Sequence, residues 1–188
     1  DRENRTGLLK VLFMGSVCVR KNAHGLLRAW SRLAPRNAKL VLCGHVENHV
    51  SRLCATELSL PSVEVRGHVK DVRAAYAEAD VFVMPSFEEG SPQVTFEAAT
   101  FGLPLIASPM GDGGISSQGR ETAYPIDPYS VTSITDALET FLSDAALRAE
   151  YGDRSYSIAP EFDWNEVGRK RARALNEACA GTTIRSLR

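Results

Sequence analysis

The most informative stretch of this chain covers residues 85–104 and reads PSFEEGSPQVTFEAATFGLP. Ser91 is a favourable N-cap residue, and Pro92 suits the first helical position, where its missing N–H costs nothing and its fixed φ is already helical. We therefore expect a helix to begin at Ser91. Two carboxylates, Glu89 and Glu97, flank this helix start. No packing argument asks for a charge at either position, so both are candidate ligand-binding groups.

Glu97 is expected to be half-buried. Val94, Ala98 and Phe101 recur at helical spacing and form an apolar stripe, and Glu97 follows Val94 by three residues, beside that stripe. Burying an ionised group without partners costs several kcal/mol. Glu97 therefore needs a cation, or hydroxyl and N–H donors that arrive with a ligand.

On both sides of this stretch, short apolar runs alternate with longer amphipathic segments, the pattern typical of a parallel sheet covered by helices. We expect strands at residues 9–14, 39–43, 63–66, 81–84, 103–107 and 123–126, and further helices at 23–33, 49–58, 71–79, 131–142, 145–151 and 164–180. A loop rich in Gly and Ser is expected at residues 108–119. Because crossovers are right-handed, the predicted fold class is α/β, a doubly wound, Rossmann-like parallel sheet of about six strands with helices on both faces.

The length of 188 residues suits one domain with a full hydrophobic core. We assign residues 1–180 to this single domain and residues 181–188, which have no apolar periodicity, to a frayed tail. Because the first residue is Asp1, the chain is also compatible with a piece of a longer polypeptide.

Composition points to a soluble globular protein and away from nucleic acid as a partner: 44% of residues are hydrophobic, 24% are charged and the formal net charge is -1. No apolar run approaches the roughly 20 residues that span a bilayer, so no transmembrane segment is expected. No signal-peptide pattern is present either, and we expect a cytoplasmic protein, with peripheral membrane attachment through a missing domain as the alternative. The nearest approach to a basic stripe is interpreted as the solvated face of a helix. Its members are Arg169, Lys170, Arg171 and Arg173.

The cysteines do not predict a metal site, because they show no C-x-x-C spacing and form no ligand set with the four histidines. They are Cys18, Cys43, Cys54 and Cys179.

A basic loop, residues 15–22 (GSVCVRKN), leaves the first strand and enters a helix. Its backbone N–H groups and the helix dipole favour an anion at the strand ends, and Lys21, helped by Arg20, would neutralise a phosphate. The alternative is that both are exposed loop cations, because the loop is neither G-x-G-x-x-G nor G-x-x-x-x-G-K-[ST].

Gly90 and Ser91 offer a second helix start, where a flexible glycine lets backbone approach a ligand closely. Glu97 would accept both hydroxyls of a ribose, and Glu89 is free to face the other part of the ligand. Structurally, Glu89 could instead favour the helix dipole, and Glu97 could pair with an Arg.

Taken together, these segments resemble a known family, the retaining glycosyltransferases of the GT-B fold, family 4, also called the group 1 glycosyltransferases. Residues 89–98 with 102–108 resemble the family's E-x7-E segment, and residues 13–15 with 20–22 are similar to its first strand and basic phosphate-binding loop. Residues 41–44, 67–71, 76–86 and 162–164 resemble further family segments.

The resemblance covers the family's C-terminal, donor-binding domain, and so implies that residues 1–180 bind a nucleotide sugar. It implies catalytic roles for Glu89, near the donor sugar, and Lys21, on the diphosphate, while Glu97 would hold the ribose. Other donor contacts would come from Gly15, Ser16, Arg20, Gly90, Ser91, Pro92 and Gln93, and base contacts from backbone near His68 and Val69. Ser16 departs from the family, which commonly has Arg there, and Arg20 is the candidate replacement.

The implied reaction transfers a sugar from a nucleoside-diphosphate donor to a hydroxyl of an unknown acceptor, with retention. It implies no metal and no cofactor, because helix termini and Lys or Arg stabilise the leaving diphosphate. It also implies that an N-terminal acceptor domain is needed for turnover. The alternatives are a non-catalytic nucleotide-binding or interaction module of the same fold and, less favoured without a glycine fingerprint, a dinucleotide oxidoreductase. We expect Glu97→Ala to weaken nucleotide binding and Glu89→Ala to spare it.

Overall fold

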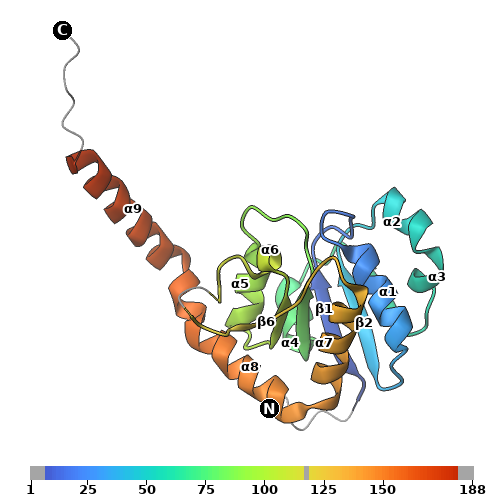
Figure 1. Ribbon diagram of the computed structural model, residues 1–188. Coiled ribbons are helices and arrows are strands. Elements are labelled where there is room, and N and C mark those ends of the chain that lie inside the picture. The colour runs from blue at the N-terminus through green and yellow to red at the C-terminus, as the bar shows by residue number, and fades with distance from the viewer. Residues whose placement is uncertain (1–6, 117–118, 182–188) are drawn as a thin grey trace.

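The computed structural model describes residues 7–116 and 119–181 and forms one α/β domain from which the last helix projects (Figure 1). The elements are β1 (Leu9–Met14), α1 (Ala23–Leu33), β2 (Ala38–Cys43), α2 (Asn48–Leu53), α3 (Ala55–Leu58), β3 (Val63–Gly67), α4 (Val72–Glu78), β4 (Val81–Met84), α5 (Gln93–Thr100), β5 (Leu105–Ala107), α6 (Pro109–Asp112), β6 (Ala123–Pro125), α7 (Val131–Ser143), α8 (Ala145–Ile158), the 3₁₀ helix η1 (Ala159–Phe162) and α9 (Trp164–Gly181).

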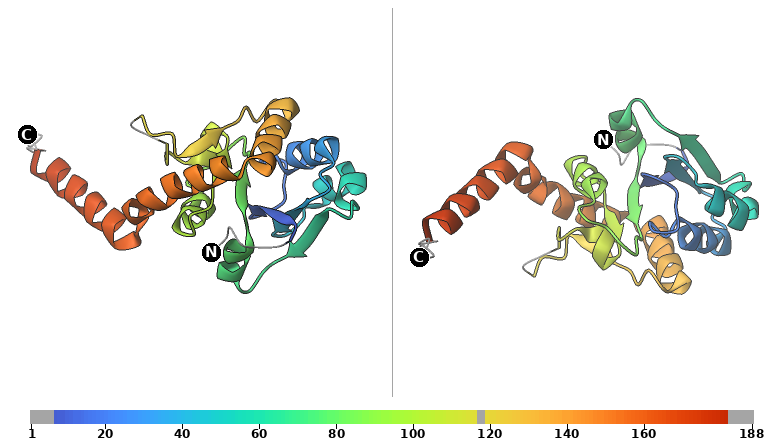
Figure 2. Two further views of the ribbon diagram at one scale, coloured as in Figure 1. Left: turned by 90° about the horizontal axis from the view of Figure 1, so that it is seen from below. Right: turned by 90° about the horizontal axis from the view of Figure 1, so that it is seen from above.

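The strands form a parallel six-stranded sheet in the order β3-β2-β1-β4-β5-β6. Helices α1 and α7 lie on one face and α4 and α5 on the other, as the end-on views show (Figure 2). The predicted fold class, a doubly wound, Rossmann-like sheet of about six strands with helices on both faces, is therefore confirmed.

The sheet is the core of the domain because its central strands are apolar and covered on both faces. β4 is buried throughout, and so are the last four residues of β1. Val, Leu, Phe and Met side chains suit such a strand, which is buried on both sides in a parallel sheet. β1 pairs with β2 along its whole length, from Leu9 opposite Ala38 to Met14 opposite Cys43.

The winding of the chain reverses between β1 and β4, which are neighbours in the sheet but not in the sequence. From β1 the chain passes through α1, β2, α2 and α3 to β3, and then returns through α4 to β4 on the other side of β1. The loops that leave these two strands therefore enter helices on opposite faces. Open α/β sheets bind ligands at such a switch point, beyond the carboxyl ends of the strands.

Helix α5 begins later than expected. It starts at Gln93 with Pro92 in the N-cap position, and no side chain caps it. The Ser91 hydroxyl, expected to cap the helix, instead accepts a hydrogen bond of 2.8 Å from Gln93 Nε2. The predicted start at Ser91 is therefore wrong by two residues.

Other boundaries also differ from expectation. The helix expected at residues 49–58 is divided into α2 and α3 at Cys54, whose φ of -122° is not helical. The loop expected at residues 108–119 contains the short helix α6, because Ser108 accepts a hydrogen bond from the Gly111 N–H and Pro109 occupies the first turn. The helix expected at 145–151 continues to Ile158.

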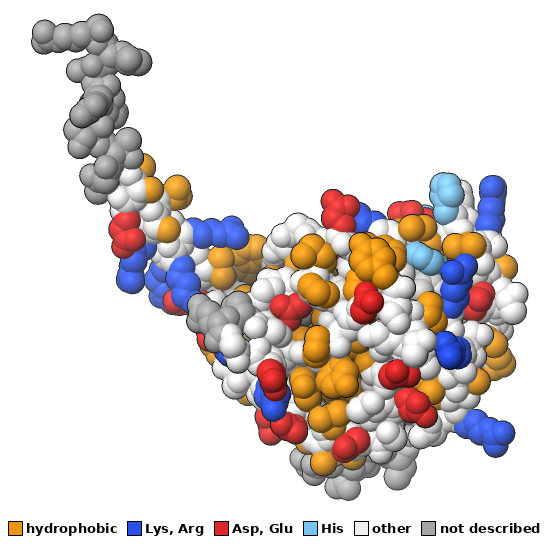
Figure 3. Space-filling model, viewed as in Figure 1, with side chains coloured by type: hydrophobic (Ala, Val, Ile, Leu, Met, Phe, Trp, Pro, Cys, Tyr) orange, Lys and Arg blue, Asp and Glu red, His pale blue; other side chains and the backbone are white. Residues whose placement is uncertain are grey.

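The four basic residues 169–171 and 173 are exposed on α9, as predicted, where acidic and hydrophobic side chains also reach the surface (Figure 3). Trp164 and Leu175 on this helix are exposed too. Gly181 ends α9, and the rest of the tail expected at 181–188 lies outside the described residues. In the described part of the chain, no helix combines the length and the apolar character needed to cross a bilayer.

Candidate functional site

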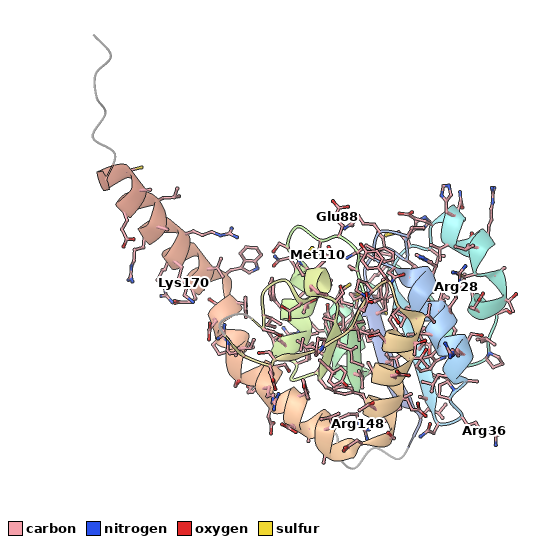
Figure 4. All side chains as sticks on the ribbon, viewed as in Figure 1. Arg28, Arg36, Glu88, Met110, Arg148 and Lys170 are labelled. Carbon is pink, nitrogen blue, oxygen red and sulfur yellow. The ribbon has the colours of Figure 1, made fainter. Side chains whose placement is uncertain are left out.

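Two loops meet at the carboxyl edge of the sheet, one from β1 (residues 15–22) and one from β4 (residues 85–92). The Phe87 N–H donates to the Arg20 carbonyl at 3.0 Å, and Arg20 Nη1 donates to the Glu88 carbonyl at 2.9 Å. Glu88 and Met110 mark this edge in Figure 4, and Arg36 and Arg148 mark the opposite one. The two loops therefore form one surface at the switch point of the sheet.

Lys21 lies over the end of β1 and is only 8% exposed. Its aliphatic chain packs on Gly15, where an added Cβ would lie 3.2 Å from Lys21 Cε. Gly15 also has a φ of 114°, a conformation that L side chains rarely adopt. The next residue, Asn22, is the N-cap of α1 and is anchored by a 2.7 Å hydrogen bond from its Nδ2 to the Pro128 carbonyl. The loop therefore positions Lys21 and does not leave it as an exposed loop cation.

Glu89 is the partner of Lys21. Lys21 Nζ donates to Glu89 Oε1, and the two side chains are 10% and 8% exposed. Ser86 Oγ donates to the same oxygen at 3.0 Å, and Arg20 Nη1 approaches Oε2 at 3.5 Å. Burial raises the pKa of the Glu89 carboxyl. Hydrogen bonds from Lys21 and Ser86 and the positive charges of Lys21 and Arg20 outweigh this effect and hold that pKa below its ordinary value. The Glu89 carboxyl is therefore ionised at neutral pH.

Glu97 is exposed, not half-buried as expected. The buried residues of α5 are Thr95, Ala98 and Ala99, and Glu97 lies on the opposite side of the helix. The apolar stripe was misplaced because Thr95 is polar yet fully buried, with its hydroxyl donating to the Gly111 carbonyl at 2.7 Å. The more buried carboxylate of the two is therefore Glu89.

The partner of Glu97 is Tyr76 of α4, not an Arg. Tyr76 Oη donates to Glu97 Oε2 at 2.8 Å and approaches the Val94 carbonyl at 3.2 Å. Burial, together with the hydrogen bond to Glu97, raises the pKa of Tyr76 far above its ordinary value, so this phenol remains a neutral donor. Tyr76 therefore fixes one oxygen of Glu97 and leaves the carboxylate facing solvent.

The remaining predicted residues lie at the same edge without joining the Lys21–Glu89 pair. Ser16, Gly90, Ser91 and Gln93 are exposed, and Pro92 is buried. At Gly90 an added Cβ would have no neighbour within 4 Å among the described residues, so none of them excludes a larger side chain there.

His68 and Val69 follow the edge strand β3; His68 is exposed and Val69 is partly buried. No hydrogen bond or ion pair between described residues links them to Lys21 or Glu89. Their base-binding role stays a prediction.

Two residues of the site were not predicted, Tyr76 and Ser86. Both are fully buried or nearly so, and both have hydroxyls directed at a carboxylate. The available signal was the rule that a buried hydroxyl needs a hydrogen-bond partner. Applied to Tyr76, which lies on a helix next to a buried strand, that rule would have suggested that its hydroxyl has a hydrogen-bond partner.

A separate cavity of about 1260 Å³ lies at the amino edge of the sheet. Its lining includes Leu9, Lys10, Asp80 and Arg148, and none of the residues predicted to bind the donor. Open α/β sheets bind ligands at the other edge, so this cavity is not the candidate site. Within residues 7–116 and 119–181, no cluster of three or more His, Cys, Asp or Glu side chains is arranged to hold a metal ion.

Comparison with protein families identifies residues 9–144 as a match to the family described as "Glycosyl transferases group 1". A D-inositol 3-phosphate glycosyltransferase from Corynebacterium glutamicum is 29% identical over 189 residues, which cover 93% of this chain and 44% of that protein. A glycosyltransferase of capsular polysaccharide biosynthesis, CapM from Staphylococcus aureus, is 26% identical over 74% of this chain and 38% of that protein. The chain thus spans about half the length of the curated relatives it matches, or less.

Solved structures share the fold. The C-terminal domain of LpcC, a group 1 family glycosyl transferase from Francisella tularensis, superposes with a TM-score of 0.74 at 18% identity, covering 86% of this chain and 89% of that one. Anabaena HepE, solved with UDP and glucose, gives a TM-score of 0.78 at 18% identity, covering 90% of this chain and 48% of that one. The chain therefore matches most of an isolated C-terminal domain and about half of a longer chain. This is the pattern of the C-terminal half of a GT-B glycosyltransferase. This chain belongs to the group 1 glycosyl transferases.

Proposed function

We propose that this chain binds the nucleoside-diphosphate sugar donor of a retaining glycosyltransferase, which transfers a hexose to an acceptor hydroxyl. The observation that carries the proposal is the Lys21–Glu89 pair, placed between two helix starts at the switch point of the sheet. A cation held there is suited to a diphosphate, and the loop that holds it is fixed at both ends.

The diphosphate would lie against Lys21, with Arg20 and the backbone around Gly15 and Ser16 beside it. Arg20 is exposed, and turning it toward an anion would exchange its surface hydrogen bond to the Glu88 carbonyl and its longer contact with Glu89 Oε2 for contacts with the anion. Positive charge that is already in place stabilises the leaving diphosphate without reorganisation. The proposed reaction therefore needs neither a metal ion nor a cofactor.

The nucleoside would extend along the edge of the sheet from α5 toward β3. The solvent-facing oxygen of Glu97 would accept ribose hydroxyls, while Tyr76 holds the other oxygen. Backbone near His68 and Val69 would meet the base. Ser91, Pro92 and Gln93 at the start of α5 would contact phosphate or sugar, and Glu89 would lie next to the donor sugar.

The acceptor would come from a further domain, N-terminal in the same polypeptide or on another chain. One observation supports this: the chain spans about half of the length of its relatives. Turnover would then need that domain, whereas donor binding would not. We place the enzyme in the cytoplasm.

The test is calorimetric titration of this chain with UDP, GDP and ADP. We expect one of them to bind, and Lys21→Ala to weaken that binding by at least about tenfold, the equivalent of about 1.4 kcal/mol for a lost charge-assisted contact. The matched control is Lys170→Ala on α9, an exposed lysine far from the site (Figure 4). No binding of any of the three by folded protein would overturn the proposal. Binding without sugar transfer when the acceptor domain is supplied would favour the non-catalytic module.

A further inference from the structure

A set of buried hydroxyls lies behind the Lys21–Glu89 pair. Ser86, Ser108 and Thr95 are polar but fully buried. Ser86 follows β4 by two residues, Ser108 is the N-cap of α6, and Thr95 lies within α5. A hydroxyl in such surroundings must be hydrogen-bonded, because leaving it unpaired costs free energy. Alanine would fill each position without that cost. We therefore ask which groups these hydroxyls bind.

Two of the three hydroxyls bond to the backbone. Ser108 Oγ donates to the Ser86 carbonyl at 2.6 Å and accepts from the Gly111 N–H at 3.0 Å. Thr95 Oγ1 donates to the Gly111 carbonyl at 2.7 Å. These contacts fix α6 against β4 and α5, and so hold the backbone of Ser86 in place.

The Ser86 hydroxyl differs, because its hydrogen bond goes to a charged side chain. It donates to Glu89 Oε1 at 3.0 Å, which is its one hydrogen-bond partner in the described part of the chain. Lys21 Nζ donates to the same oxygen. Two donors on one oxygen from different directions define the orientation of the carboxylate, and the backbone that carries Ser86 is itself held by Ser108.

We propose that Ser86 is a positioning residue, whose hydroxyl holds the Glu89 carboxylate against Lys21 from the protein side. Ser86 does not reach the ligand surface; it acts through Glu89. The importance of this orientation for sugar transfer rests on the proposed function, in which Glu89 lies next to the donor sugar and Lys21 contacts the diphosphate. The contact itself belongs to the free protein and can be tested without any nucleotide.

The test is the pKa of Glu89, measured by carbon NMR of the side-chain carboxyl in the unliganded chain, with the signal identified by its loss in Glu89→Gln. Ser86→Ala removes a hydrogen bond to the ionised form, so the pKa of Glu89 should rise by about 0.5 to 1. Ser86→Cys, nearly isosteric but a weaker donor, should give a smaller rise in the same direction, and carries the test if the alanine variant does not fold.

The matched control is Ser155→Ala in α8. Ser155 is also fully buried, but its hydroxyl donates to the Leu103 carbonyl at 2.7 Å and approaches the Gly152 carbonyl at 2.9 Å, away from the site. This variant should leave the pKa of Glu89 unchanged. An unchanged Glu89 pKa in the Ser86 variants, or an equal rise in the control, would overturn the proposal. A failure of nucleotide binding in the calorimetric titration would overturn the proposed function and leave this result standing.

Discussion

The carboxylates of Glu89 and Glu97 lie on either side of the start of α5 but have opposite surroundings. Glu89 is buried, ionised and held by Lys21, Arg20 and Ser86, whereas Glu97 is exposed and held by one neutral phenol, Tyr76. The first arrangement is costly to disturb, and the second leaves an acceptor ready for hydroxyl donors. The difference teaches that Glu89 supports the local fold through its buried contacts, whereas Glu97 contributes little to the fold and, in the proposed function, serves mainly the ligand.

The largest effect should come from breaking the buried pair. Lys21→Met leaves Glu89 buried without its cation, which should lower the free energy of unfolding by about 3 kcal/mol, as for other broken buried ion pairs. Urea unfolding measures it. The double variant Lys21→Met/Glu89→Leu should recover part of the loss, and Lys170→Met should cost little. If Lys21→Met has the same free energy of unfolding as the wild type, Lys21 does not stabilise the buried Glu89 carboxylate.

Glu97 should show the reverse balance. Glu97→Ala should weaken nucleoside-diphosphate binding by about tenfold, because hydrogen bonds to a charged group contribute about 1.5 kcal/mol or more. The free energy of unfolding of this variant should differ from that of the wild type by less than about 1 kcal/mol. The Glu97 side chain is exposed, and the Tyr76 hydroxyl still has the Val94 carbonyl as a hydrogen-bond acceptor. Glu89→Gln is expected to spare binding of the bare nucleotide. Equal losses of affinity in both variants would remove the proposed division of roles.

Acid should remove the stabilising effect of the Glu89 carboxylate. The pKa of Glu89 is lower in the folded state than its ordinary value of 4.5, so its stabilising effect is complete above that value and is lost as the pH falls through the lower, folded pKa. Glu89→Gln should therefore flatten the loss of stability below about pH 4.5, measured by thermal unfolding across a pH series. Identical acid profiles for Glu89→Gln and wild type would contradict the assigned pKa direction.

The smallest effect should come from Tyr76→Phe. It removes the hydrogen bond to Glu97 while the ring continues to stack on Phe101 at 5.4 Å. Nucleotide affinity should fall by about threefold, the value of a modest hydrogen bond. Calorimetric titration against Glu97→Ala shows whether the two changes act together. A Tyr76→Phe effect that adds fully to that of Glu97→Ala would mean that the two side chains act independently.

The sheet and the two loops at its carboxyl edge could be predicted from the sequence, because apolar strands and glycine at strand ends are local signals. The loops that carry Lys21 and Glu89 were placed correctly at strand ends. The burial of Glu97 was predicted wrongly, because Thr95 takes a core position by bonding to Gly111, a residue distant in the sequence. The roles of Tyr76 and Ser86 were missed for the same reason, since a hydroxyl's partner is set by tertiary contacts.

The central claim, that the ligand site lies at the carboxyl edge between β1 and β4, is tested most directly by NMR titration of backbone amides with whichever of UDP, GDP or ADP binds. We predict that the perturbed amides cluster in residues 15–22 and 85–97, with smaller changes near His68. Perturbations centred instead on the amino-edge cavity, around Lys10, Asp80 and Arg148, would contradict the account.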